Sequence, residues 1–174
     1  MCASIDGTGD IVEFIRKGIV WEEWLENFKE GLAAPGGKDR MLFDLTITGP
    51  GMFSIKDLFD LSLELDVRIE TKIMFAFHPD IIFSPFAWPK HILTRKIDEL
   101  LEYIEPRATG KQATLVNTLL EMRNRPSFEE DYPEQFVQGK KNGKGFQNRL
   151  DEIRDEKITI ADIYKVDDEL YEWW

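Results

Sequence analysis

The sequence contains a single cysteine, Cys2, among 174 residues. One cysteine excludes an internal disulfide, and it also excludes a zinc or iron–sulfur site built from several cysteines of this chain. No run of about 18 apolar residues occurs, so we expect no membrane-spanning helix and no membrane partner. The first residues lack the basic region ahead of an apolar one that marks a secretory signal. The sequence therefore predicts a cytoplasmic protein.

Basic residues are also in short supply. Lys and Arg number 22 against 33 Asp and Glu, which gives a formal net charge of −11. Proteins that bind nucleic acids neutralise phosphates with clustered Lys and Arg, so this balance argues against a nucleic-acid partner. The one basic cluster, residues 139–144, also contains Gly and Asn. We interpret it as a solvated loop, with phosphate binding as the alternative.

Apolar residues, in contrast, are plentiful. The chain is 43% hydrophobic and 12% aromatic, which provides enough surface to offset the conformational entropy lost on folding. Its length is that of one domain, or of one domain with a tail. We therefore expect a globular body.

Three segments have the alternation or the turn boundaries of β-strands: residues 3–5, 41–47 and 67–77. Residues with helical periodicity fill the two intervals between them, for example over 21–32 and 54–65. A strand–helix–strand–helix–strand order at this spacing is typical of right-handed βαβ units and a parallel sheet. The carboxyl ends of such strands meet at one edge of the sheet, where α/β proteins carry their chemistry.

Past residue 80 the pattern becomes helical. A proline-rich connector leads to expected helices over 89–106, 110–124 and 146–154, and Thr159 with Asp162 can cap a last turn. We predict an α/β protein: a partial (β/α) barrel of about three parallel strands in residues 1–88, and a mainly helical extension in residues 89–174. The side chains expected to face inward from the helix at 146–154 are Phe146, Leu150 and Ile153.

Few motifs of known chemistry are present. The sequence has no phosphate-binding loop, no dinucleotide fingerprint and no nucleophile elbow. Its two histidines, His78 and His91, lack the i, i+4 spacing that places a zinc-binding pair on one helical face. We interpret both as structural, with His78 the better catalytic candidate because it follows the third strand.

One group of polar residues could form a binding site. Ser4 and Asp6 lie at the end of the first strand, and Arg16 follows near the end of the next helix. A hydroxyl, a carboxylate and a guanidinium that converge there could hold a zwitterionic amino-acid moiety, with the arginine on its carboxylate. The alternative is that these residues form no site: the aspartate would be a carboxylate at the start of the helix, and the arginine would be solvated.

The same region carries a resemblance to a known family. Residues 2–9 (CASIDGTG), 14–18 (FIRKG) and 21–24 (WEEW) resemble the fourth strand and following helix of the radical S-adenosylmethionine (radical SAM) superfamily. Its SPASM and twitch branches carry a serine–x–aspartate–glycine there, followed by an arginine–x–glycine. The proline-rich connector at 79–89 is similar to that of the family. Residues 148–154 (NRLDEIR) resemble the leucine–aspartate–x–x–arginine motif at the end of twitch-domain proteins.

The resemblance implies roles for individual residues. Ser4 and Arg16 would hold the carboxylate of SAM, and Asp6 would support the turn or the ribose. Thr48 and Phe77, at the ends of the next two strands, would line the site. In the complete family a [4Fe-4S] cluster donates an electron to SAM, and the resulting 5′-deoxyadenosyl radical abstracts hydrogen from a peptide or small-molecule substrate.

The departure from the family is equally specific. The CxxxCxxC motif that binds the cluster and the glycine–glycine–glutamate motif on the second strand are both missing. The chain therefore resembles the C-terminal part of a radical SAM enzyme. It supplies no cluster ligands, and we expect it to be inactive in isolation. The expected partner is the missing N-terminal half, or a chain that supplies it.

Two alternatives stay open. The chain could be a non-catalytic remnant or binding module that pairs with a separate cluster-bearing chain, or it could be an unrelated α/β domain with the same pattern. In the resemblance the half barrel begins at its fourth strand, so residues 3–5 would form an open edge and the apolar inner faces of the next two strands would be uncovered. We then expect an isolated chain that is marginally soluble, oligomeric or unfolded.

Overall fold

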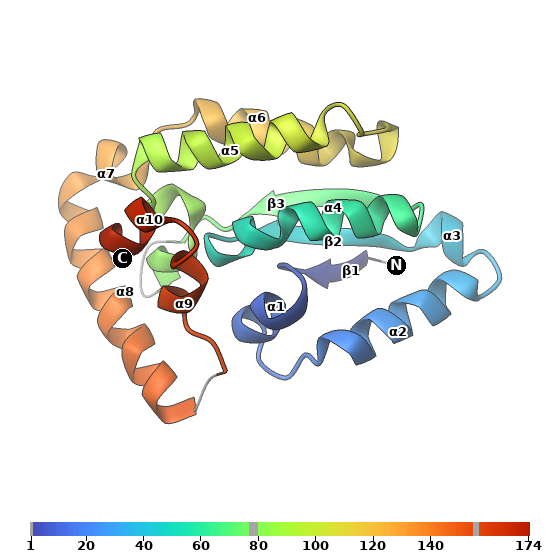
Figure 1. Cartoon of the computed structure of the whole chain (residues 1–174), viewed down its shortest axis with the longest axis horizontal. Helices are drawn as coiled ribbons and strands as arrows, with labels where there is room; N and C mark the ends of the chain where they lie inside the picture. Colours follow the sequence, from blue (N-terminus) through green and yellow to red (C-terminus); the bar gives the residue numbers. More distant parts are fainter. Residues whose placement is uncertain (1, 77–79, 155–156) are drawn as a thin grey trace.

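Three parallel strands form the centre of the molecule (Figure 1). The computed structural model describes residues 2–76, 80–154 and 157–174. The strands are β1 (Cys2–Ile5), β2 (Leu42–Ile47) and β3 (Arg68–Ile73), and they lie in the order β1-β2-β3. This confirms the predicted α/β class with three parallel strands. The sheet is open, because β1 and β3 each pair only with β2 among the described residues.

Helices join the strands, as parallel pairing requires. The first connection contains α1 (Gly9–Ile15), α2 (Trp21–Ala33) and α3 (Gly37–Arg40). The second contains η1 (Pro50–Ser54) and α4 (Ile55–Glu64). The stripe predicted on α2 packs on the sheet: the ring of Trp24 stacks on Phe28, with centroids 5.3 Å apart, and Phe28 lies 4.7 Å from Phe43.

The two faces of the sheet differ in chemistry. Phe43, Leu45 and Ile47 of β2 are almost fully buried, at 0–1% exposed. The alternate residues point to the other face, where Asp44 and Lys72 form an ion pair with side chains 26% and 52% exposed. The expectation of an uncovered apolar face is therefore wrong, since the crossover helices cover the apolar side and the charged side is the one in contact with solvent.

The third strand is shorter than predicted. β3 ends at Ile73, and Met74 donates one further backbone bond, to the carbonyl of Ile47 at 2.9 Å. β2 itself ends at Ile47, so the parallel pairing of the two strands stops at Ile47 and Ile73.

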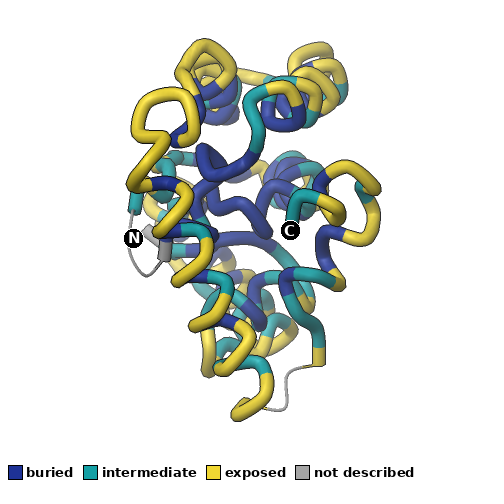
Figure 2. The backbone as a smooth tube through the Cα atoms, turned by 90° about the vertical axis from the view of Figure 1, so that its left-hand side faces the viewer, coloured by how far each residue is buried: buried dark blue, intermediate teal, exposed yellow. Residues whose placement is uncertain are grey.

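The C-terminal region is helical, as predicted. One hydrophobic cluster contains side chains from the sheet, such as Phe43, and from these helices, such as Leu93 and Leu115. Figure 2 shows the buried backbone at the centre of the molecule, with exposed segments on the outer helices. No helix in the described part of the chain is long and apolar enough to cross a membrane. The elements are η2 (Asp80–Phe83), η3 (Pro85–Ala87), α5 (Lys90–Ile104), η4 (Gly110–Gln112), α6 (Ala113–Asn124), α7 (Phe128–Asp131), α8 (Pro133–Arg154), α9 (Ile160–Tyr164) and α10 (Asp168–Trp173).

Residues 139–144 are part of α8, so the interpretation of this cluster as a loop is wrong. Gly139 is buried against η2, where an added Cβ would lie 3.1 Å from the Cδ1 atom of Ile81. Glycine therefore serves a close approach between α8 and η2 rather than a turn.

The end of α8 also departs from expectation. Phe146 and Ile153 were expected to face inward, but they are 48% and 79% exposed. The fully buried positions of α8 end at Gln147. Its last two turns therefore extend beyond the part of the molecule that could cover them.

Candidate functional site

The candidate site lies at the carboxyl ends of the strands, which in Figure 1 point toward α8. Ser4 lies on β1, Asp6 follows its last residue, and Arg16 caps the carboxyl end of α1. The chain turns sharply between β1 and α1 because Gly7 packs against Ser54, whose Oγ would lie 2.4 Å from an added Cβ. The short α1 then returns Arg16 to the end of β1.

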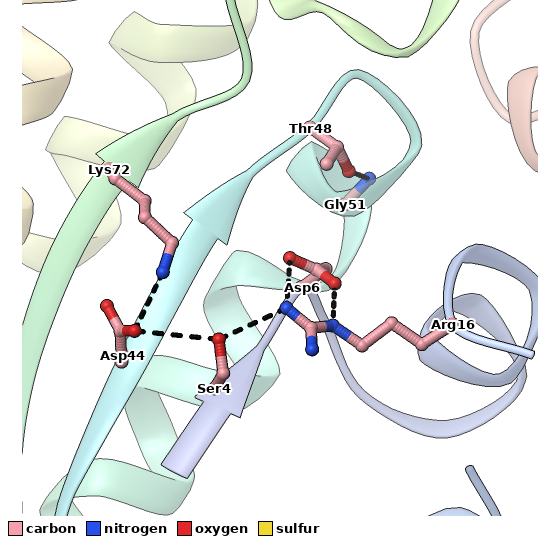
Figure 3. Close-up of polar contacts among 7 residues, drawn as sticks. All are labelled: Ser4, Asp6, Arg16, Asp44, Thr48, Gly51 and Lys72. Atoms are coloured by element: carbon pink, nitrogen blue, oxygen red, sulfur yellow. Dashed lines mark hydrogen bonds and ion pairs between the residues drawn. The ribbon is translucent and has the colours of Figure 1, made fainter. Parts of the chain in front are cut away.

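The structure brings Ser4, Asp6 and Arg16 together (Figure 3). Nη2 of Arg16 donates to Oγ of Ser4 at 3.1 Å and to Oδ1 of Asp6 at 3.3 Å. Nε of Arg16 donates to Oδ2 of Asp6, which completes a two-point ion pair. Asp6 is 5% exposed, whereas the Arg16 side chain is 35% exposed. The buried carboxylate thus orients a guanidinium that still reaches solvent.

Within the described part of the chain, one nitrogen of Arg16 has no hydrogen-bond partner. Nη1 makes no hydrogen bond to any part of the chain that the structure describes, and Figure 3 shows it turned away from both partners. A fixed guanidinium with a free N–H group can donate to a ligand carboxylate.

The polar contacts continue across the sheet. Ser4 Oγ donates to Oδ2 of Asp44 at 3.5 Å, and Nζ of Lys72 donates to the same oxygen at 2.7 Å. The hydroxyl proton of Ser4 is therefore directed toward Asp44, and its lone pair accepts from Arg16. In this arrangement Ser4 accepts from Arg16 and helps to position it.

A cavity of about 360 Å³ opens beside Arg16. It combines the guanidinium and two threonine hydroxyls with an apolar wall. Thr48, predicted from the sequence, lies in it and is buried, and its Oγ1 accepts the backbone N–H of Gly51 at 3.0 Å. The lining residues are Asp6, Ile15, Arg16, Thr46, Thr48, Met74 and Phe83.

The other candidate residues from the sequence are Phe77, His78 and His91. Phe77 and His78 lie outside the described residues. His91 is exposed on α5. Asp44 and Lys72 were not predicted; their one sequence signal is the period-two spacing that puts each on the charged face of its strand.

No group of three or more His, Cys, Asp or Glu side chains among the described residues could hold a metal ion. Comparisons with protein families, with curated proteins and with solved structures found no match to this chain.

Proposed function

We propose that this chain supplies one side of a SAM-binding site, as the C-terminal portion of a radical SAM enzyme built on a partial (β/α) barrel. The family comes from the resemblance of residues 2–24. The observation that supports it most is Arg16, which Asp6 holds at the end of β1 and which lines a cavity; its Nη1 has no hydrogen-bond partner among the described residues. In this proposal Arg16 contacts the SAM carboxylate, and Asp6 and Ser4 position Arg16.

The cavity suits such a ligand. The hydroxyl of Thr46 offers a polar contact, while Ile15, Met74 and Phe83 provide an apolar wall for the uncharged part of the molecule. SAM, when bound, is the source of the radical that abstracts hydrogen from a peptide or small-molecule substrate in the complete enzyme. The residues of this chain bind and orient it and limit its contact with water.

The chain's own residues do not fit a [4Fe-4S] cluster, because only one cysteine is present. The cluster ligands would come from a partner. β1 has one unpaired edge among the described residues, and an unpaired edge can add a further strand. We propose that a cluster-bearing N-terminal half, or a chain that supplies it, extends the sheet from β1.

The same edge supports the alternative of a non-catalytic binding module that pairs with a separate cluster-bearing chain. The two functions differ in the role of Arg16. In the SAM-binding proposal Arg16 binds the ligand, whereas in the binding-module alternative it only stabilises the end of the strand.

A titration calorimetry experiment with SAM tests the ligand site. Arg16→Ala should weaken binding about tenfold or more, because a charge-assisted hydrogen bond contributes roughly 1.5–3 kcal/mol. Arg68→Ala is the matched control, since Arg68 lies on the same face of the sheet in an exposed pair with Glu70. Equal affinities for the wild-type chain and both variants would contradict the proposal.

A further inference from the structure

Phe83 differs from its neighbours in the chain. Residues 81–88 are all buried except Phe83, which is partly exposed. Its main-chain oxygen accepts the N–H of Gly49 at 2.7 Å, and this bond ties it to the turn after β2. The fold therefore fixes the backbone of this phenylalanine and leaves part of its surface uncovered.

The ring of Phe83 is held as well. It stacks on Phe14 of α1, with ring centroids 6.2 Å apart and ring planes inclined by 23°. Phe14 is itself only 5% exposed, so it provides a rigid support. At the same time Phe83 lines the cavity beside Arg16. A supported aromatic side chain is thus available at the wall of that cavity.

The rest of the wall favours the same kind of ligand. Ile15 and Met74 line the cavity together with Phe83. Any apolar group could bury surface on this wall. A planar ring gains more, because aromatic rings pair favourably with each other and with thioether sulfur beyond the area that they bury. Arg16, at the same cavity, supplies the contact for an anionic group.

We propose that this cavity binds a molecule in which a short linker joins a carboxylate to a planar aromatic ring. The carboxylate lies on Arg16, and the ring packs against Phe83 and Met74. The cavity volume of about 360 Å³ is within the range of small-molecule sites. Phe83 is then the residue that selects for the ring, while the contact of Arg16 with a carboxylate rests on the proposed function.

NMR titrations of the full chain with small probes test the inference. Phenylpropanoate carries both groups, cyclohexylpropanoate replaces the aromatic ring with a saturated one, and phenylpropanamide replaces the carboxylate with an uncharged amide. Phenylpropanoate should bind about threefold or more tighter than cyclohexylpropanoate. It should bind about tenfold or more tighter than the amide.

Variants assign the preference to Phe83. Phe83→Leu should weaken binding of phenylpropanoate about threefold or more and leave that of cyclohexylpropanoate nearly unchanged, because leucine keeps an apolar wall without the ring. Phe83→Trp should keep the preference for the aromatic acid. Phe53→Leu is the matched control, since Phe53 is also partly exposed and lines two other cavities. It should change neither affinity.

The possible results separate the aromatic site from the proposed function. Equal affinities for the two acids, or the same loss in Phe83→Leu and Phe53→Leu, would overturn the aromatic site even if SAM binds. Equal affinities for phenylpropanoate and its amide would overturn the role of Arg16, on which both depend. A chain that shows the expected preferences but does not bind SAM would refute SAM as the ligand and support the aromatic site.

Discussion

Asp6 determines what Arg16 can do. The carboxylate is 5% exposed and accepts from two nitrogens of the guanidinium, so the side chain of Arg16 is held in one orientation beside the cavity that it lines. A solvated arginine would lose side-chain entropy on binding a ligand. An arginine that the fold already holds in place has lost part of its side-chain entropy on folding, so less is lost when the ligand binds.

Part of this site could be predicted from the sequence. Ser4 and Asp6 were predicted because they lie where the first strand ends. Arg16 was predicted because it lies near the end of the helix that follows this strand. Asp44 and Lys72 could not be predicted. The contact of Asp44 with Ser4, and that of Lys72 with Asp44, depend on the register between β1, β2 and β3. Register is a tertiary property that no local pattern specifies in these short strands.

Tyr164 is a second residue whose environment has a measurable consequence. It is fully buried, and its hydroxyl accepts the indole N–H of Trp88 at 3.1 Å. Burial raises the pKa of the phenol above its ordinary value of 10.0. Above about pH 10 the tyrosine of the unfolded chain ionises first, so the free energy of unfolding should fall as pH rises from there.

Tyr164→Phe separates the two effects. At pH 7 it should lower the free energy of unfolding by about 1–3 kcal/mol, because the N–H of Trp88 loses its acceptor. Above pH 10 it should lose stability less steeply than the wild type. Urea denaturation across pH measures both, with Tyr171→Phe at a 45% exposed site as the control. An equally steep alkaline loss in Tyr164→Phe would exclude this role.

Among the elements, periodicity predicted most of the fold. Apolar stripes were sufficient to predict α2, α4, α5 and α6, and alternation was sufficient to predict β2. Each of these elements buries one face on a common core. The first half of α8 could not be predicted. Its glycines and Asn142 favour a loop by propensity, and the helix is supported there by the packing of Gly139 against Ile81.

Alanine substitutions at two glycines of α8 test this explanation, because they should change the stability of the protein in different directions. Gly139→Ala adds a Cβ that would lie 3.1 Å from Ile81, so it should destabilise the protein or gain nothing. Gly145→Ala meets no atom within 4 Å and should raise the free energy of unfolding by up to about 1 kcal/mol. Thermal denaturation measures both, and an equal gain from the two substitutions would show that α8 does not need the close approach.

At the scale of the whole molecule, two features bear on the proposed partner. β1 has an edge without a strand partner among the described residues, and the neighbouring face of the sheet carries charged side chains from β2 and β3. A charged face resists non-specific association better than the apolar face expected from the sequence. A partner that extends the sheet would have to match this charge.

The missing cluster ligands give a prediction for the isolated chain. After anaerobic reconstitution with iron and sulfide, it should show no [4Fe-4S] absorption and should not cleave SAM, since a single cysteine cannot hold the cluster. Cys2→Ser should give the same spectrum. Stoichiometric iron and sulfide on the wild-type chain would refute the proposal that a partner supplies the ligands.

The most direct test of the central claim is the NMR signal of the Arg16 side-chain Nε–H during a titration with SAM. We predict that this signal shifts progressively and reaches a plateau, while the corresponding signal of Arg68 stays in place. That outcome would place the ligand at the Arg16 guanidinium, at the end of β1. An Arg16 signal that does not move while SAM binds, or one that moves no more than that of Arg68, would contradict the claim.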